Sequence, residues 1–184
     1  MEQMNPRSRR DEYGSRINKD HSRFLVYAVP WGSILLFSFV PMLPIATALP
    51  LVPPFGFVML LAWRMLRPGL LPVWAGFPLG LFDDLFSGQP FGSAIVMWSL
   101  AMIALEIVET RFPWRDFLLD WVTASGLLIA YIALSALFSG APITGPMLAA
   151  LMPQVVISIL LYPLLSRLAA RMDRFRLMRI RTIS

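Results

Sequence analysis

Four carboxylates in otherwise apolar stretches are the side chains of this sequence best placed to do chemistry. Asp83 and Asp84 are adjacent, and Glu106 and Glu109 are three residues apart, so the two glutamates share one face of a helix. Carboxylates inside a membrane can relay protons, couple ions or act as general acids and bases. Two other interpretations stay open for the aspartates: they could mark the outer water interface and cap a turn, or they could bind a partner or pack a helix.

The other residues that catalysis usually needs are missing from the apolar part of the chain. There is no cysteine, and His21 and Lys19, the sole histidine and lysine, lie in the polar N-terminal stretch. This excludes thiolate chemistry and disulfides, and it removes paired-histidine zinc sites and a Ser–His dyad. No glycine-rich phosphate loop with lysine occurs. We therefore predict no catalytic residues, no cofactor and no metal site.

Small residues repeat every four positions around the aspartate pair. Glycines four apart on an apolar helix allow a second helix to approach closely. Asp84 continues the spacing, and we expect the face to continue across the following turn. The predicted helix-packing or partner-binding face consists of Gly76, Gly80, Asp83, Asp84, Gly88 and Gly92.

Long uncharged runs indicate that these residues are positioned by membrane-spanning helices. The chain is 57% hydrophobic, with a mean hydropathy of +0.66. Six runs separated by charged or Pro/Gly-rich turns predict spans. They cover about 24–44, 53–66, 70–86, 91–110, 117–138 and 147–168.

The distribution of basic residues favours six spans over five. With six, the N-terminal tail, the turns after the second and fourth spans, and the C-terminal tail hold 6, 2, 2 and 6 basic residues, which is all 16. If spans two and three formed one helix, Arg64 and Arg67 would lie in the bilayer, at about 2.5–3.5 kcal/mol each at mid-depth. We predict an all-α, polytopic transmembrane bundle of six helices with both ends in the cytoplasm.

The two tails complete the predicted organisation. Residues 1–23 form a basic tail, 24–168 the transmembrane domain and 169–184 a second basic tail. We expect the first helix to be retained as an anchor rather than cleaved as a signal peptide. The net charge of +5 points to anionic phospholipids, not to nucleic acid, as the partner of the basic surface. The arginines expected at the lipid surface are Arg167, Arg171, Arg174, Arg176, Arg179 and Arg181.

A second group of charges is expected where the second and fourth helices reach the cytoplasm. Arg64, Arg67 and Arg111 should lie at the depth of Glu106 and Glu109. Opposite charges at that depth predict structural ion pairs between the two helices.

The stretch 80–94, Gly-Leu-Phe-Asp-Asp-Leu-Phe-Ser-Gly-Gln-Pro-Phe-Gly-Ser-Ala, resembles the MreD family of rod shape-determining proteins. Asp84 is the position that matches the family's aspartate, and Asp83 is an addition. The resemblance implies a non-enzymatic inner-membrane member of the cell-wall elongation machinery. It also implies partners: the MreC scaffold directly, and the MreB filament, RodA and a penicillin-binding transpeptidase in the same complex.

Two other functions remain open. A substrate-binding subunit of a vitamin-type transporter would need a polar pocket near mid-depth, where the sequence offers little beyond Ser99, Gln154 and Ser158. A membrane enzyme would need the carboxylates described above to be catalytic. A tightly bound small molecule would favour transport, and turnover lost on Asp84→Asn would favour an enzyme.

Overall fold

The computed structural model describes residues 23–42, 52–88, 90–112, 114, 116–140 and 144–176, and within these ranges the chain is helical without strands. The predicted all-α fold with six helices is confirmed. Two one-turn 3-10 helices are present, of which Val40–Met42 follows the first long helix and Val73–Ala75 directly precedes the third. The six helices are α1 (Arg23–Ser38), α2 (Phe55–Leu66), α3 (Gly76–Phe86), α4 (Ser93–Arg111), α5 (Phe117–Phe138) and α6 (Gly145–Arg176).

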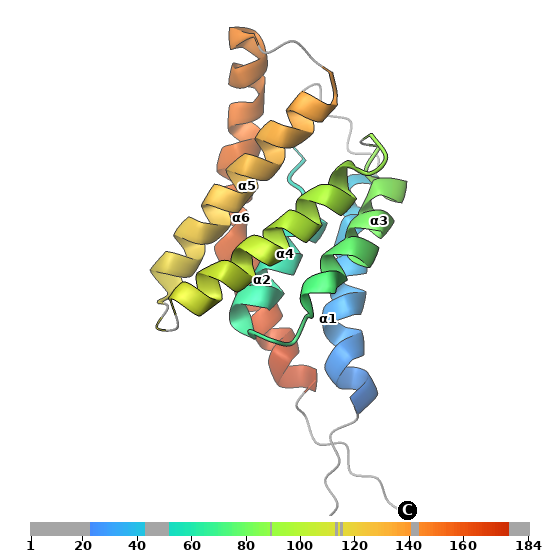
Figure 1. Cartoon of the computed structure of the whole chain (residues 1–184), viewed down its shortest axis with the longest axis vertical. Helices are drawn as coiled ribbons and strands as arrows, with labels where there is room; N and C mark the ends of the chain where they lie inside the picture. Colours follow the sequence, from blue (N-terminus) through green and yellow to red (C-terminus); the bar gives the residue numbers. More distant parts are fainter. Residues whose placement is uncertain are drawn as a thin grey trace, which may run out of the picture.

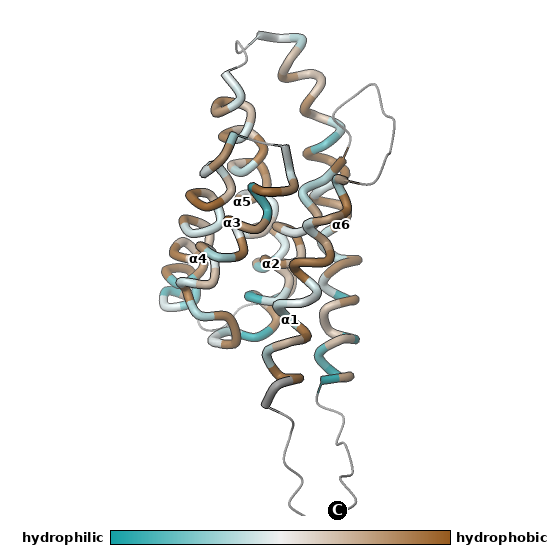
Figure 2. Tube along the Cα trace, turned by 90° about the vertical axis from the view of Figure 1, so that its right-hand side faces the viewer, coloured by the Kyte–Doolittle hydropathy of each residue, from teal (hydrophilic) through white to brown (hydrophobic). Residues whose placement is uncertain are grey.

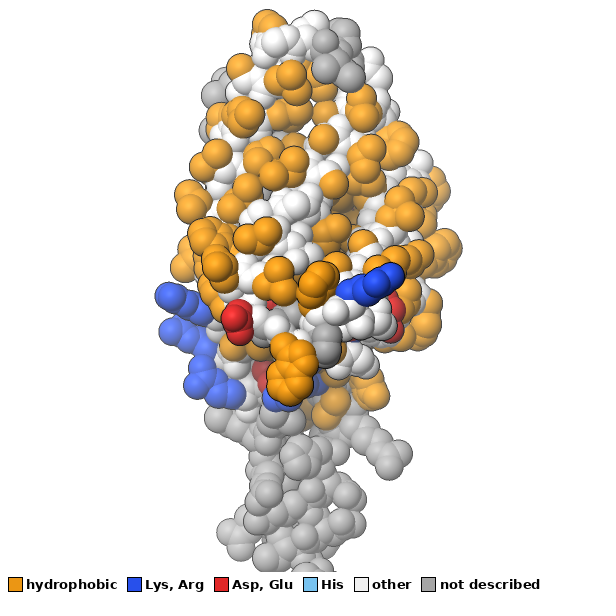
Figure 3. Space-filling model, turned by 60° about the vertical axis from the view of Figure 1, so that its left-hand side comes forward, with side chains coloured by type: hydrophobic (Ala, Val, Ile, Leu, Met, Phe, Trp, Pro, Cys, Tyr) orange, Lys and Arg blue, Asp and Glu red, His pale blue; other side chains and the backbone are white. Residues whose placement is uncertain are grey.

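Successive helices alternate in direction, so α1 begins and α6 ends at the same end of the bundle (Figure 1). We call this the basic end, because the arginine side chains gather toward it while apolar side chains cover the surface beyond (Figure 3). The end that carries the turn between α3 and α4 is called the opposite end. The start of α1 and the end of α6 thus lie at the end where the arginines gather, as the positive-inside rule leads one to expect for two cytoplasmic ends.

Four segments are long and apolar enough to cross a bilayer: Leu25–Met42, α4, α5 and α6. The spans expected at 53–66 and 70–86 are built as shorter helices of 12 and 11 residues. Pro53 and Pro54 lie ahead of α2, and Gly69, with φ of +82°, and Pro72 separate α2 from α3. These residues break the helical hydrogen-bond pattern, so the two segments cannot merge into one long span.

Helix α2 tolerates its short length because protein surrounds it. Ten of its twelve residues are buried, and it contacts α1, α4, α5 and α6. The Trp63 indole donates a hydrogen bond to the Ser33 hydroxyl of α1 at 2.8 Å, and Phe57 stacks on Tyr131 of α5 with ring centroids 4.4 Å apart. A helix enclosed in this way does not have to match the thickness of the hydrocarbon core.

The outward-facing sides of α4, α5 and α6 are apolar. On α4 the exposed large side chains are Val96, Leu100, Ile103 and Ile107, at the spacing of one helical face. A water-soluble monomer rarely exposes a continuous apolar surface of this kind, whereas a membrane protein presents it to lipid. The tube coloured by hydropathy shows the same division, with hydrophilic residues concentrated near the basic end and near the α3–α4 turn (Figure 2).

Helix α6 runs without interruption through Pro153 and Pro163 to Arg176. The boundary expected at residue 168 therefore falls inside a continuous helix. The remaining residues of the predicted C-terminal tail, 177–184, and those of the N-terminal tail before Arg23 lie outside the described part of the chain.

Candidate functional site: carboxylates at the two ends of the bundle

Two glycines of α3 bring its backbone against the backbone of α4. A Cβ atom added at Gly76 would lie 2.8 Å from the carbonyl oxygen of Trp98, and one added at Gly80 would lie 2.7 Å from that of Ala94. Real Cβ atoms do not approach backbone this closely, so any side chain at either position would push the two helices apart. The absence of a side chain is what lets α3 and α4 touch.

One turn further along α3, Asp84 binds the N-terminus of α4. Its Oδ1 accepts hydrogen bonds from the Ala94 backbone N–H at 2.8 Å and from the Ser93 hydroxyl at 3.4 Å. Its Oδ2 accepts from the N–H groups of Gly92 at 3.0 Å and Ile95 at 3.1 Å. The first N–H groups of a helix have no partner within that helix, and the helix dipole favours an anion there.

The identity of the N-cap residue explains why a carboxylate from another helix is needed. The residue at the N-cap of α4 is Gly92, which has no side chain to accept a hydrogen bond. Asp84 supplies the missing acceptor from α3. These hydrogen bonds stabilise the negative charge of Asp84 at an end of the bundle where the sequence places no basic residue.

Gly88 and Gly92 do not extend the packing face, contrary to the prediction from their spacing. Both have positive φ, +68° and +94°, and a Cβ at either would meet nothing within 4 Å. They are turn glycines, chosen for a backbone conformation that other residues adopt with strain. Helix α3 ends at Phe86, so the residues after it do not follow helical geometry. The four-residue spacing of Gly88 and Gly92 therefore does not place them on the face that carries Gly76 and Gly80.

Asp83 occupies different surroundings from its neighbour. It is 6% exposed and lies beside Ser38 of α1, and it lines a hollow that Tyr131 and Gln154 also border. The adjacent aspartates therefore do not share one site. Among the described residues, no group of three or more His, Cys, Asp or Glu side chains is placed to hold a metal ion.

At the basic end, Arg64 joins α2 to α4. Its Nη2 lies 2.9 Å from Oε2 of Glu109 and also contacts Oε2 of Glu106. Arg64 is only 1% exposed, and Glu109 is largely buried, so this pair sits where water screens it little. The glutamates, three residues apart on α4, thus meet the same guanidinium nitrogen.

Two further arginines, Arg67 and Arg176, pair with Asp173, an acidic residue that the sequence-based prediction did not include. Arg67 donates to Oδ2 of Asp173 at 2.8 Å, and Arg176 contacts Oδ1 of the same residue at 2.6 Å. Asp173 is the sole acidic residue after position 120, a signal that could have identified it as a partner. The expectation that Arg67 pairs with the α4 glutamates is therefore wrong, because α2 packs against α6 as well as α4.

The prediction that Arg176 lies at the lipid surface is wrong. It is 6% exposed, donates to the backbone carbonyl of Val26 at 2.9 Å, and lies over the Trp63 ring with its Cζ 5.7 Å from the centroid. It connects α6 to α1 and α2. Three other arginines of the C-terminal segment, Arg167, Arg171 and Arg174, are exposed, as is Arg111 at the end of α4, and Arg179 and Arg181 lie outside the described residues.

Residues 22–172 match the family model described as rod shape-determining protein MreD. No curated protein and no solved structure matches the chain. The matched range contains α1 to α5 and most of α6, and with them the contacts of Asp84 and Arg64.

Proposed function

The chain belongs to the MreD family of rod shape-determining proteins, and from this premise we propose that it is a non-catalytic scaffold of the bacterial cell-wall elongation complex. It is a multi-pass membrane protein, with four helices long and apolar enough to cross a membrane. We place it in the inner membrane, with the basic end in the cytoplasm, in accordance with the positive-inside rule.

The observation that best supports a scaffold is the way three of the four carboxylates in apolar stretches are used. Asp84 has its oxygens occupied by four donors of Gly92 and the first turn of α4, and Glu106 and Glu109 pair with Arg64. A general acid or base must be able to exchange a proton with a substrate. Carboxylates that hold helices together are unsuited to that task and well suited to fixing the shape of a docking surface.

The proposed partners follow from this surface. We propose that the MreC scaffold binds directly, on the surface whose shape the α3–α4 pair sets. RodA and its penicillin-binding transpeptidase would join the same complex. On the cytoplasmic side, the exposed Arg167, Arg171 and Arg174 would meet anionic phospholipids and lie near the MreB filament.

The test uses glycine substitutions in cells depleted of their own copy of the protein. Gly80→Leu separates α3 from α4, since even a Cβ there meets backbone at 2.7 Å. We expect recovery of MreC with the protein to fall by about tenfold, the factor equivalent to about 1.4 kcal/mol, and the cells to become round. The measurements are co-purification and cell morphology, each normalised to the amount of protein in the membrane.

Gly126→Leu is the matched control. Gly126 also lies within a helix, α5, but an added Cβ there meets nothing within 4 Å. Cells carrying it should stay rod-shaped and retain the partner. Normal co-purification and rod shape with Gly80→Leu would show that partner binding does not depend on the contact between α3 and α4.

A transport subunit remains the second candidate, because a partly polar hollow lies beside Asp83 at the opposite end. A water-soluble vitamin retained through purification would favour this function over a scaffold.

A further inference from the structure

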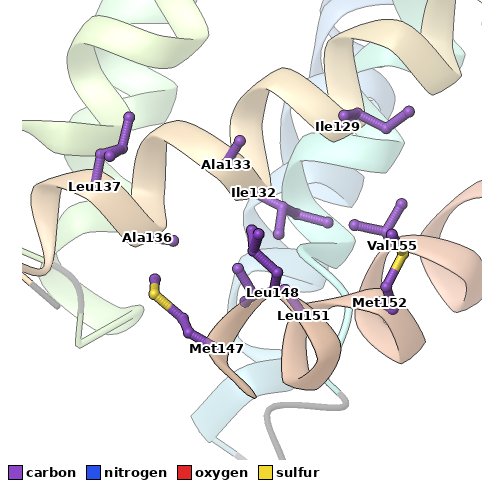
Figure 4. A pocket seen from close by; sticks show the side chains of 10 residues that line it. All are labelled: Ile129, Ile132, Ala133, Ala136, Leu137, Met147, Leu148, Leu151, Met152 and Val155. Carbon is purple, nitrogen blue, oxygen red and sulfur yellow. The ribbon is translucent and has the colours of Figure 1, made fainter. Parts of the chain in front are cut away.

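Helices α5 and α6 diverge toward the opposite end and leave an apolar cleft between them. The cleft has a volume of about 430 Å³, and the side chains around it are aliphatic or methionine, with Ile132, Ala136, Met147 and Leu151 among them (Figure 4). Its volume lies within the range of sites that bind drug-sized molecules, about 300–1,000 Å³. By itself such a cleft would identify no ligand, because any apolar chain could lie in it.

A second cavity adjoins the cleft, a third adjoins the second, and both have partly polar walls. The next cavity, of about 270 Å³, shares Ile132 and Leu151 with the cleft and adds Ser135 and Gln154. Tyr131 and Gln154 then border a third cavity as well, of about 200 Å³. The three spaces are neighbours, which we together call the hollow, and their walls change from apolar to partly polar toward Asp83.

The innermost cavity is lined by a buried carboxyl group, which lies beside Ser38 of α1, and by a hydroxyl group without a hydrogen-bond partner among the described residues. Asp83 and Ser87 both line it. The Ser87 hydroxyl there and the Ser135 hydroxyl in the middle cavity are buried without a hydrogen-bond partner among the described residues. Buried polar groups are nearly always paired, so a set of unpaired hydroxyls around a cavity indicates a ligand or ordered water.

The charge of the walls restricts the kind of ligand. Every Lys, Arg and His of the sequence lies in positions 1–23, 64–67, 111–115 or 167–181, and the described ones lie toward the basic end. A group with net negative charge would find no cation near Asp83. A carboxyl group beside the Tyr131 ring and several hydroxyl groups is suited to a primary ammonium, which needs acceptors and gains from an aromatic neighbour.

We propose that this hollow binds a membrane lipid with a primary-ammonium head group, such as a phosphatidylethanolamine. One acyl chain lies in the α5–α6 cleft, and the ammonium group reaches Asp83. The Ser135 hydroxyl of the middle cavity, which is buried without a hydrogen-bond partner among the described residues, can donate to the phosphate. This lipid site does not depend on the scaffold function proposed above, and it is separate from the basic surface at the other end.

Native mass spectrometry of the full-length protein tests the site. The protein is taken from vesicles with equal amounts of phosphatidylethanolamine and phosphatidylglycerol of identical acyl chains. We expect the amine lipid to be retained in preference. Asp83→Asn, which keeps the size of the side chain, should reduce the ratio of the two adducts by about tenfold, as expected for the loss of one charge-assisted hydrogen bond.

Ala136→Phe gives a second and independent variant, because Ala136 lines both the cleft and the middle cavity. It should lower retention of both lipids while leaving the contacts of Asp83 in place. Asp116→Asn, an exposed acid at the start of α5, is the control and should behave like the natural protein. Thermal unfolding in detergent shows that each variant is folded before its lipids are compared.

Three results would overturn the proposal. The first is equal retention of the two lipids by the natural protein. The second is a preference for the amine lipid that Asp83→Asn leaves unchanged, because the ammonium would then bind elsewhere. The third is equally tight binding of glycerophosphoethanolamine, which lacks acyl chains, because the site would then take a water-soluble ligand and the cleft would be irrelevant.

Discussion

The two ends of the bundle neutralise buried carboxylates in different ways. At the opposite end, Asp84 accepts hydrogen bonds from the N-terminus of α4. At the basic end, Glu109 and Asp173 pair with guanidinium groups, from Arg64 and from Arg67 and Arg176. The same chemical group therefore has a backbone partner at one end and a side-chain partner at the other.

Membrane insertion supplies a reason for this difference. Arginine and lysine are retained on the cytoplasmic side during insertion, so a carboxylate on the other side has to be stabilised without them. A helix N-terminus offers unpaired N–H groups and about half a positive charge, neither of which restricts topology. The arrangement at Asp84 shows how two helices can be fixed together by charge without any basic residue.

The largest effect is expected at Arg64. Arg64→Met removes the cation while Glu109 stays largely buried, and breaking one side of a buried pair costs about 3–5 kcal/mol. Unfolding followed in detergent should show a loss in this range. Arg111→Met is the control, because Arg111 is exposed. A loss below about 1 kcal/mol, the usual value of an exposed pair, would mean that the pair is screened by water.

A smaller loss is expected at Asp84. Asp84→Ala leaves the first N–H groups of α4 without an acceptor, and loss of a helix cap costs about 0.5–2 kcal/mol. Asp84→Asn keeps one carbonyl oxygen and should cost less. Hydrogen exchange at the N–H groups of Gly92, Ala94 and Ile95 provides a local measurement, since these groups donate to Asp84. Unchanged exchange in Asp84→Ala would show that the cap contributes nothing to the order of α4.

The smallest effect is expected at Arg67, whose side chain is about 50% exposed. Arg67→Met leaves Asp173 paired with Arg176, so the loss should stay at about 0.2–1 kcal/mol, as for exposed pairs. Arg176→Met should cost clearly more, because it also removes the bond to the Val26 carbonyl and the contact with Trp63. Equal losses for the two variants would mean that burial does not distinguish the two arginines.

Much of the architecture was predictable from local patterns. The number of helices, the side on which basic residues gather, and the turn between α2 and α3 follow from apolar runs, charge and Pro/Gly positions. Each segment inserts into the membrane nearly independently of the others, so its own sequence largely decides whether it forms a span and in which direction it crosses. The small-residue spacing of Gly76 and Gly80 also pointed to a face that a second helix could approach.

The tertiary structure alone decided which groups meet. The partners of Asp84 are backbone N–H groups, which carry no residue signature, and Arg176 pairs inward because α6 crosses beside α1 and α2. The turn role of Gly88 and Gly92 depended on where α3 ends. The cleft depended on how α5 and α6 diverge, and the hollow beside Asp83 depended on how the start of α2 and the end of α3 meet α5 and α6. Whether a segment forms a helix depends on the spacing of residues within that segment. Which side chains meet between two helices depends on the angle and depth at which the helices pack, and these involve residues far apart in the sequence.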